Sequence, residues 1–284
     1  MNLNFNFNNV GDKLIEKIAG AVEVLYDPNG DKMAYRDLSA TILQDIGENK
    51  ELSYEERISI AQECSFLLKK NRNRRKIISD SIEYLDENAS PNLVDDSWLV
   101  NFWDKAGTVS DEVFQNLWSH ILAKEVNEPN TISKRLLHNL SLMSNNDANN
   151  FLNLAQFCFI DKNIQDISHP IIFIKEDPEF YASFGIYSNV LKELEQFCLI
   201  ETNYDSGFAF KNGKILSYLQ STLEINAPRI PIGNVRLTTD GQKLLTIISK
   251  SHKDIILDFT IEKLQYKKCN TKIYRSTHIK SRKN

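Results

Sequence analysis

FWDKAGTVSDEVFQNLWSHILAKEV, residues 102–126, contains Trp103 and Trp118, and the third tryptophan of the chain, Trp98, lies just before it. Large aromatic side chains at helical spacing are typical of a contact between helices, because each ring buries about 150–250 Å² when it packs. Gly107 begins the G-T-V-S turn between two such helical segments. We therefore predict two short helices that face each other through these large side chains.

Both predicted helices begin at residues that are typical of helix caps. Asp95 and Asp96 precede the first, and Ser110 opens the second as S-D-E-V, with acidic residues in the first turn. An aromatic platform for stacking nucleic-acid bases is the alternative interpretation. Lys105 is the one basic residue among these rings, so the sequence favours a packed core.

The composition is that of an ordinary globular protein of 284 residues, with 42% hydrophobic and 25% charged residues. The four cysteines are widely separated and form no C-x-x-C pair, which suggests neither a zinc knuckle nor a disulfide framework and fits a cytoplasmic protein. No segment approaches the roughly 20 consecutive apolar residues of a membrane-spanning helix, and the N-terminus does not resemble a signal peptide. We expect a cytoplasmic protein that does not bind membranes.

Charge is distributed unevenly along the chain, which has a net charge of −4. From Lys263 onward there are eight Lys or Arg residues and no Asp or Glu. A second basic run, KKNRNRRK at 69–76, lies within a long helix predicted from Ser53 to Leu85, where Glu56 completes a capping box with Ser53. An acidic body therefore carries two concentrations of positive charge.

From residue 145 the sequence predicts helix, strand, helix, helix, strand, strand and helix, which is the order of a winged helix-turn-helix domain. LKELEQFCLIE resembles the end of a recognition helix that leads into the wing, and VRLTTDGQKLL resembles the closing strand and helix of that superfamily. Residues 204–234 enlarge the wing and predict a hairpin that turns at Asn212–Gly213.

The predicted fold class is mainly α (α+β), a helical N-terminal domain followed by a modified winged helix-turn-helix domain with an enlarged wing. The predicted segments are an N-terminal helical region with a long basic helix (1–90), a tryptophan-rich helical joint (91–144), a winged-helix-like domain (145–262) and a basic C-terminal tail (263–284).

The segment from Asp95 to Phe151 resembles the bacterial family named domain of unknown function 2806. The resemblance extends over about residues 95–250, and Trp103 stands where the family more often has Phe. LWSHILAKE also shows a looser similarity to abortive-infection proteins of the alpha type, which implies a role in phage defence. The family pattern is held by Asp96, Trp98, Phe102, Val109, Ser110, Asp111, Glu112, Gln115, Trp118, Leu122, Glu125, Arg135, Asp147 and Phe151.

Catalytic and metal-binding patterns are missing from the sequence. The five histidines show no H-x-x-x-H or H-E-x-x-H spacing, and neither a phosphate-binding glycine loop nor G-x-S-x-G occurs. We therefore predict no metal, no cofactor and no catalytic residue. Glu125 and Arg135 are predicted to form an internal ion pair that holds the helix after Pro129; the alternative is an active site of a toxin-like enzyme at these two residues.

The positive charge is the functional signal that the sequence offers. Clustered Lys and Arg bind phosphates without reading base sequence, and Tyr266 and Tyr274 interleave with the basic residues of the tail, which suits single strands. A solvated helix and a disordered tail are the structural alternatives, and Glu193 and Glu195 would repel phosphates from the predicted recognition helix. The predicted nucleic-acid contacts are Lys69, Lys70, Arg72, Arg74, Arg75, Lys76, Lys267, Lys268, Lys272 and Arg275.

The sequence therefore predicts a non-catalytic module that binds nucleic acid or a protein, with an accessory or sensor role in phage defence implied by resemblance. A homo-oligomer is a further expected partner. The alternatives are a toxin-like effector enzyme and an oligomeric scaffold that binds only proteins.

Overall fold

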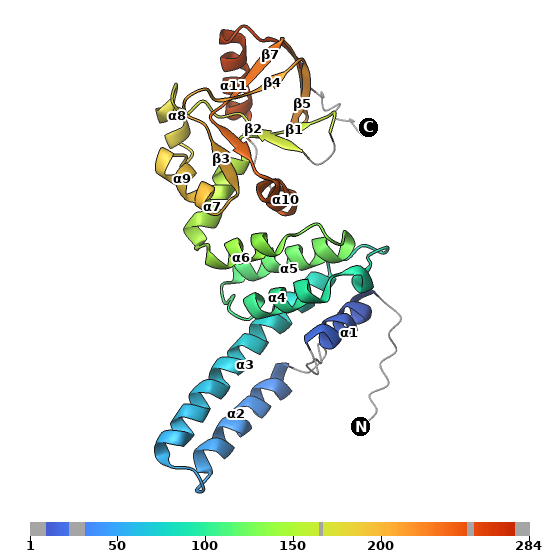
Figure 1. Cartoon of the computed structure of the whole chain (residues 1–284), viewed down its shortest axis with the longest axis vertical. Helices are drawn as coiled ribbons and strands as arrows, with labels where there is room; N and C mark the ends of the chain where they lie inside the picture. Colours follow the sequence, from blue (N-terminus) through green and yellow to red (C-terminus); the bar gives the residue numbers. More distant parts are fainter. Residues whose placement is uncertain (1–9, 23–31, 165–166, 249–252, 276–284) are drawn as a thin grey trace, which may run out of the picture. The chain divides into compact units, whose positions relative to one another are not determined.

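The computed structural model divides the chain into an N-terminal unit, Met1–Ser141, and a C-terminal unit, Leu142–Asn284 (Figure 1). The N-terminal unit is helical in its described parts, and the C-terminal unit combines helices with antiparallel sheets. The predicted α+β class is thereby confirmed. The tryptophan-rich segment, predicted as a separate joint, belongs to the N-terminal unit. The structure describes residues 10–22, 32–164, 167–248 and 253–275, with the backbone alone at 32–39 and 275.

An amphipathic helix and a long helical hairpin precede the tryptophans in the N-terminal unit. Helix α2 and helix α3 run side by side as the hairpin, and α3 continues past α2 to pack against α5 and α4 (Figure 1). Helix α1 packs against α4. The elements are α1 (Val10–Val22), α2 (Lys32–Glu48), α3 (Tyr54–Ile82), a 3-10 turn η1 (Pro91–Leu93), α4 (Asp96–Ala106), α5 (Glu112–Asn127) and α6 (Lys134–Leu142).

The predicted aromatic contact between two helices is confirmed. On α4, the rings of Trp98 and Phe102 stack with centroids 5.3 Å apart, and Phe102 meets Trp118 of α5 at 5.4 Å. All three side chains are buried. The indole N–H of Trp98 also donates to the carbonyl of Ile132 at 2.7 Å, so this core ring has its polar atom satisfied.

Local capping signals were good guides to where helices begin. Ser53 and Glu56 form the predicted capping box at the start of α3. The start of α5 differs from the prediction by one residue, because the Asp111 carboxylate, and not Ser110, accepts from the first free N–H groups of the helix. The Ser110 hydroxyl accepts instead from the side-chain amide of Asn73 at 3.2 Å.

The C-terminal unit is built around three antiparallel sheets. A five-stranded sheet has the order β2-β1-β5-β6-β9, and two-stranded sheets pair β3 with β8 and β4 with β7. Its elements are α7 (Asn145–Ala155), β1 (Cys158–Asp161), β2 (Ser168–Pro170), α8 (Pro178–Ala182), α9 (Ser188–Gln196), β3 (Ile200–Thr202), β4 (Phe208–Lys211), β5 (Lys214–Tyr218), β6 (Ser221–Asn226), β7 (Arg229–Gly233), β8 (Val235–Leu237), α10 (Thr239–Ile247), α11 (Asp254–Tyr266) and β9 (Asn270–Arg275).

The predicted hairpin at Asn212–Gly213 is wrong. The strand before this turn, β4, pairs with β7, whereas the strand after it, β5, pairs with β6 and β1. Asn212 has a φ of 70°, so the turn-forming residue takes a left-handed conformation, but it carries the chain from one sheet to another. The hairpin in this segment is β5–β6, where Tyr218 lies opposite Ser221.

The basic tail predicted from Lys263 also needs correction. Residues up to Tyr266 complete α11, and β9 adds a strand to the edge of the large sheet, where Leu223 of β6 lies opposite Ile273. Leu264 of α11 and Cys269, just before β9, are both buried, which explains this attachment, whereas Ile273 is 37% exposed. The rest of the predicted tail, 276–284, lies outside the described residues.

Candidate nucleic-acid interface

The basic run on α3 is partly built into the N-terminal unit. Asn73 is buried, and its amide donates to the Gly107 carbonyl at 2.9 Å. The guanidinium of Arg74 donates to the Trp103 carbonyl at 2.8 Å and lies over the Trp103 ring at 4.7 Å. Arg74 therefore packs the helix against α4, which is a structural role.

The other basic side chains of this run differ in what they contact. Lys76 forms an ion pair with Asp80 one turn later, at 2.7 Å, and Lys70 lies over the Phe66 ring at 4.6 Å. Lys69 and Arg72 are exposed, and Arg75 is half-buried. The run of six basic residues is thus not one uniform surface, and its binding to phosphates stays a prediction.

The basic residues near the C-terminus are likewise divided. Lys267 pairs with Glu176 at 2.6 Å, and Lys272 lies opposite Glu224 across the β6–β9 ladder. Lys268 is exposed, with a φ of 59° immediately after α11. The structure gives the backbone of Arg275 in β9 but not its side chain.

Two further basic residues join Lys268, and the sequence analysis missed both. Lys211 of β4 and Arg229 of β7 are exposed and occupy directly opposite positions of their ladder. The Cys269 thiol contacts the Arg229 carbonyl at 3.9 Å, which brings the segment that includes Lys268 against this strand. We call Lys211, Arg229 and Lys268 the basic cluster.

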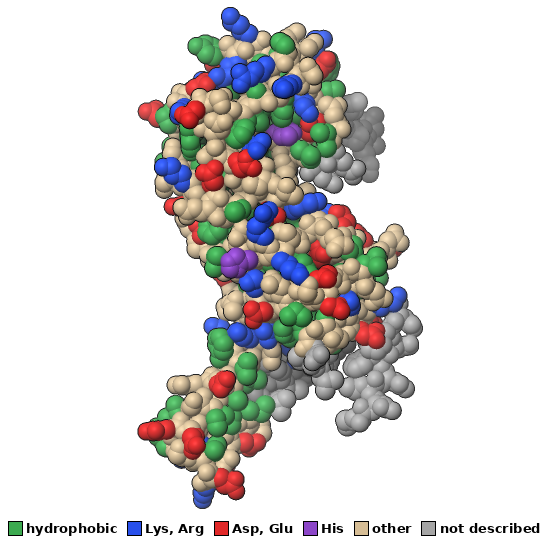
Figure 2. All heavy atoms as spheres, viewed as in Figure 1, with side chains coloured by type: hydrophobic (Ala, Val, Ile, Leu, Met, Phe, Trp, Pro, Cys, Tyr) green, Lys and Arg blue, Asp and Glu red, His purple; other side chains and the backbone are tan. Residues whose placement is uncertain are grey.

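The basic cluster concentrates positive charge at one place on the β4–β7 ladder, where Lys211 lies opposite Arg229. Like charges directly opposite each other on antiparallel strands destabilise a sheet. Within the described part of the chain, none of the three residues of the basic cluster forms an ion pair with an acidic residue. Figure 2 shows Lys and Arg side chains gathered over the end of the C-terminal unit that carries β4 and β7. The arrangement can bind an anion that bridges neighbouring positive charges. No linear spacing could have revealed it, since the pairing register brings the residues together.

Helix α9 exposes a small polar surface. Ser188, Asn189 and Lys192 are exposed, whereas Val190 and Leu194 face the core. The Glu195 carboxylate turns toward β3 and accepts from the backbone N–H and the hydroxyl of Thr202, at 2.8 and 2.9 Å. One of the two carboxylates that the sequence analysis counted against phosphate binding is thus occupied within the fold.

A buried polar group lies between the sheets of the C-terminal unit. The side chain of Asp161 is fully buried and pairs with Lys214 at 2.7 Å, and His169 lies 3.5 Å from the same carboxylate oxygen. Phe210 packs on both partners, with its ring centroid 4.5 Å from that of His169 and 5.1 Å from the Lys214 ammonium. Burial by itself raises the pKa of Asp161, but the Lys214 hydrogen bond and the backbone N–H of Asn163 bring this pKa below its ordinary value.

The C-terminal unit is expected to lose stability as the pH falls below about 6.5, the ordinary value for histidine. Burial lowers the pKa of His169 more than the Asp161 carboxylate raises it. Both groups therefore bind protons less readily in the folded state, so their contributions are present at high pH and are lost as the pH falls through the lowered pKa values, first that of His169 and then that of Asp161. Urea unfolding followed by far-UV circular dichroism at pH 7.5 and 5.0 measures the difference.

The matched control for this pH effect is His169→Gln, which removes the upper titration and keeps a polar side chain. Its stability should change less between pH 7.5 and 5.0 than that of the unsubstituted protein. Equal changes in the two proteins would contradict the assignment of this titration to His169.

Glu125 occupies a buried position next to the loop that leads to α6. Its side-chain oxygens accept from the backbone N–H groups of Asn130 and Ile132, both at 2.7 Å. Burial raises the pKa of Glu125, and these N–H groups oppose that rise. The predicted ion pair with Arg135, which is exposed, stays a prediction. The carboxylate holds the loop after Pro129 through backbone N–H groups, which the sequence did not indicate.

The described residues offer neither a metal site nor a membrane-spanning helix. They include no group of three or more His, Cys, Asp or Glu residues that is arranged to hold a metal ion. Nor does any described helix combine the length and apolar character needed to cross a membrane.

Comparison with known proteins gave one match. The model of a family described as "Protein of unknown function (DUF2806)" matches residues 56–258, which is more than half of the chain. The search of curated proteins and the search of solved structures found no match.

Proposed function

The chain belongs to the DUF2806 family, and we propose that it is a non-catalytic binding protein whose C-terminal unit contacts nucleic-acid phosphates. The observation that carries this proposal is the basic cluster, in which Lys211 and Arg229 lie directly opposite each other beside the segment that contains Lys268. The negative phosphates of a nucleic acid would neutralise this positive charge. Binding is driven by release of the counterions that are condensed on the nucleic acid.

The topology supports a winged-helix interpretation of this unit. Helices α7, α8 and α9 precede β3, which pairs antiparallel with β8. Strand β4 follows β3, strand β7 precedes β8, and β4 and β7 pair with each other, so the two ladders form one long wing. A hydrogen bond from Asn203 N–H to the Asn234 carbonyl joins the two ladders. In this interpretation Lys211 and Arg229 lie at the far end of the wing, away from the β3–β8 pair.

The contact is expected to be one with phosphates and not with base edges. All three members of the basic cluster are cations, and the exposed polar surface of α9 is limited to a few side chains such as Asn189 and Lys192. Base-specific readout needs side chains that are placed to bond base edges, whereas positive charge alone binds without sequence preference. The proposed ligand is therefore nucleic acid of any sequence.

Replacing the basic cluster by alanine (K211A/R229A/K268A) is expected to weaken binding to a labelled oligonucleotide at least about tenfold at low salt. The slope of log affinity against log salt concentration should also fall by roughly two to three, because each lost phosphate contact contributes a little less than one. Fluorescence anisotropy with single-stranded DNA, duplex DNA and RNA across a salt series measures both quantities.

A control with the same change in net charge is K50A/K162A/K175A, which removes three exposed basic side chains outside the basic cluster and outside the predicted contacts. It should bind nearly as the unsubstituted protein does. A larger loss in the control would place the interface outside the basic cluster, and absence of binding by the unsubstituted protein at low salt would reject the proposal. An accessory role in phage defence, which rests on sequence resemblance, stays a prediction.

A further inference from the structure

The hairpin of α2 and α3 lacks a core over most of its length. From residue 40 to residue 72 no side chain is buried, and the first buried residue of α3 is Asn73, where the helix meets the rest of the N-terminal unit. Apolar side chains lie exposed here: Ile60 is 37% exposed, Leu67 50% and Phe66 55%. Figure 2 shows hydrophobic side chains gathered over this hairpin.

In a hairpin of two helices, each helix covers only one side of the other, so apolar side chains on the remaining sides stay in contact with water. Most helical stability in proteins comes from packing such apolar side chains. Helix α2 covers one side of α3, where the Arg57 guanidinium donates to the Gly47 carbonyl at 2.7 Å and Ala61, Cys64 and Leu68 are half-buried. The side with Ile60 and Leu67 is left uncovered by the described residues. A further helical layer would complete the packing.

One stripe on the uncovered side has a regular pattern. Its residues follow one another at alternating spacings of four and three, which places them on one face of the helix. The stripe runs from an acidic end through two apolar residues to a basic end. We call it the α3 stripe, and it consists of Glu56, Ile60, Glu63, Leu67 and Lys70.

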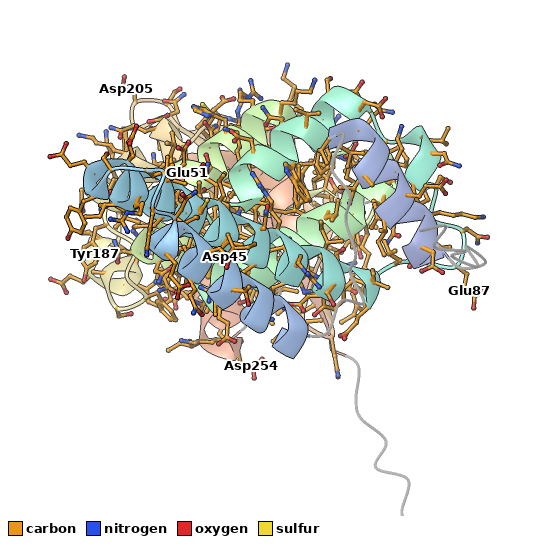
Figure 3. All side chains as sticks on the ribbon, turned by 90° about the horizontal axis from the view of Figure 1, so that it is seen from below. Asp45, Glu51, Glu87, Tyr187, Asp205 and Asp254 are labelled. Carbon is orange, nitrogen blue, oxygen red and sulfur yellow. The ribbon has the colours of Figure 1, made fainter. Side chains whose placement is uncertain are left out.

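The charges of residues 40–76, which form most of the hairpin, have the same polarity. Residues 40–63 contain six acidic and two basic residues, whereas residues 64–76 contain six basic residues and no acidic one. Glu51 lies at the turn between the helices, and Asp45 lies on α2 (Figure 3). One end of the hairpin is therefore negative and the other positive, so a second hairpin in the opposite direction is its electrostatic complement.

We propose that two copies of the protein associate through antiparallel packing of their α3 stripes, so that the two hairpins form a four-helix layer. Antiparallel alignment about a two-fold axis near Glu63 places Glu56 of each copy at the level of Lys70 of the other. The same alignment places Ile60 within one residue, about 1.5 Å, of the level of Leu67. The paired stretch from residue 56 to residue 70 is about 21 Å long at 1.5 Å per residue.

In this alignment each residue of the stripe meets a favourable partner, except at the centre. The apolar pair is flanked by two symmetry-related ion pairs, which fix the direction of the helices. At the axis the Glu63 carboxylates of the two copies face each other and repel. Loss of the charge at Glu56 should therefore weaken the dimer, whereas loss of the charge at Glu63 should strengthen it.

The test measures self-association of the full chain by analytical ultracentrifugation over a range of concentrations. Glu56→Lys and Lys70→Glu should each weaken the dimer at least about tenfold, because each change makes both symmetry-related pairs repulsive. An equimolar mixture of the two variants should restore association, since a mixed dimer has one ion pair with its charges exchanged and one original ion pair. Parallel packing predicts instead that neither single variant weakens the dimer, because like charges already face each other in that alignment.

Two further variants separate association from folding. Glu56→Gln keeps the capping box with Ser53 and removes only the charge, so its effect should be smaller than that of Glu56→Lys. Glu63→Gln should tighten the dimer several-fold, because it removes the repulsion at the axis. Unchanged tryptophan fluorescence in each variant shows that the N-terminal unit remains folded.

Three results would overturn the proposal. A monomer at every concentration would leave the stripe to a different protein or to another segment of the same chain. Equal association of Glu56→Lys, Lys70→Glu and the unsubstituted protein would place the interface elsewhere or make it parallel. A mixture that stays dissociated would exclude the antiparallel alignment.

Discussion

Replacing Gly241 by alanine is expected to destabilise the C-terminal unit by about 3–5 kcal/mol, as over-packing against rigid backbone does at its upper end. A Cβ atom at this position would lie 1.9 Å from the Leu199 carbonyl oxygen and 2.9 Å from its carbon. Backbone atoms cannot rotate away as a side chain does. Helix α10 would have to move away from the segment that precedes β3.

That movement would break interactions at the start of α10. The Thr238 N–H donates to the same Leu199 carbonyl at 3.0 Å, and the Thr238 hydroxyl caps the helix by accepting from the Gly241 N–H. Urea unfolding followed by far-UV circular dichroism measures the loss. All three tryptophans lie in the N-terminal unit, so their fluorescence should report a transition that the substitution leaves unchanged.

Gly20→Ala is the matched control for Gly241→Ala. Gly20 lies within α1, is exposed and has no atom within 4 Å of the position of an added Cβ. This change should stabilise α1 by at most about 1 kcal/mol, the difference in helix propensity between the two residues. If Gly241→Ala cost less than about 1 kcal/mol, the close packing of α10 on Leu199 would be refuted.

Local signals in the sequence predicted where helices begin, whereas the pairing of strands that are distant in sequence was not predicted. Ser53 and Glu56 are three residues apart, and the capping box that they form depends on nothing outside its own turn. Asn212–Gly213 also marks a real turn, yet the strands on either side choose partners far away in sequence. Strand β9 was not predicted for the same reason: it pairs with β6, which is distant in sequence. Its basic residues are typical of a solvated tail.

The residues of the candidate site also differ in how far the sequence could predict them. A helix turns about 100° per residue, so six basic residues in eight positions of α3 must place some of them toward the protein. Of the basic residues, Arg74 faces inward and donates to the Trp103 carbonyl, next to the buried Asn73. Lys211 and Arg229 were unpredictable from spacing, since only the register of β4 against β7 makes them neighbours. Positive charge in the sequence therefore pointed to candidate residues, but the fold was needed to show which basic residues are neighbours.

Glu125→Ala is expected to destabilise the N-terminal unit by about 2–5 kcal/mol, because each buried N–H that loses its acceptor costs about 1–3 kcal/mol. Glu125 is 1% exposed, and its carboxylate accepts from the N–H groups of Asn130 and Ile132. The loss should spread to the tryptophan contact, since the Ile132 carbonyl accepts from the Trp98 indole. Tryptophan fluorescence during urea unfolding follows this unit directly.

Two other substitutions decide whether the buried carboxylate, and not the general loss of a glutamate, is responsible. Glu128→Ala removes an exposed carboxylate that pairs with Lys124 one turn earlier, and it should cost about 0.5 kcal/mol or less. Glu125→Gln keeps one acceptor oxygen but presents an amide N–H₂ where the second acceptor was, so its cost should fall between those of the two alanine variants. A Glu125→Ala protein as stable as Glu128→Ala would show that the loop holds its conformation without the carboxylate.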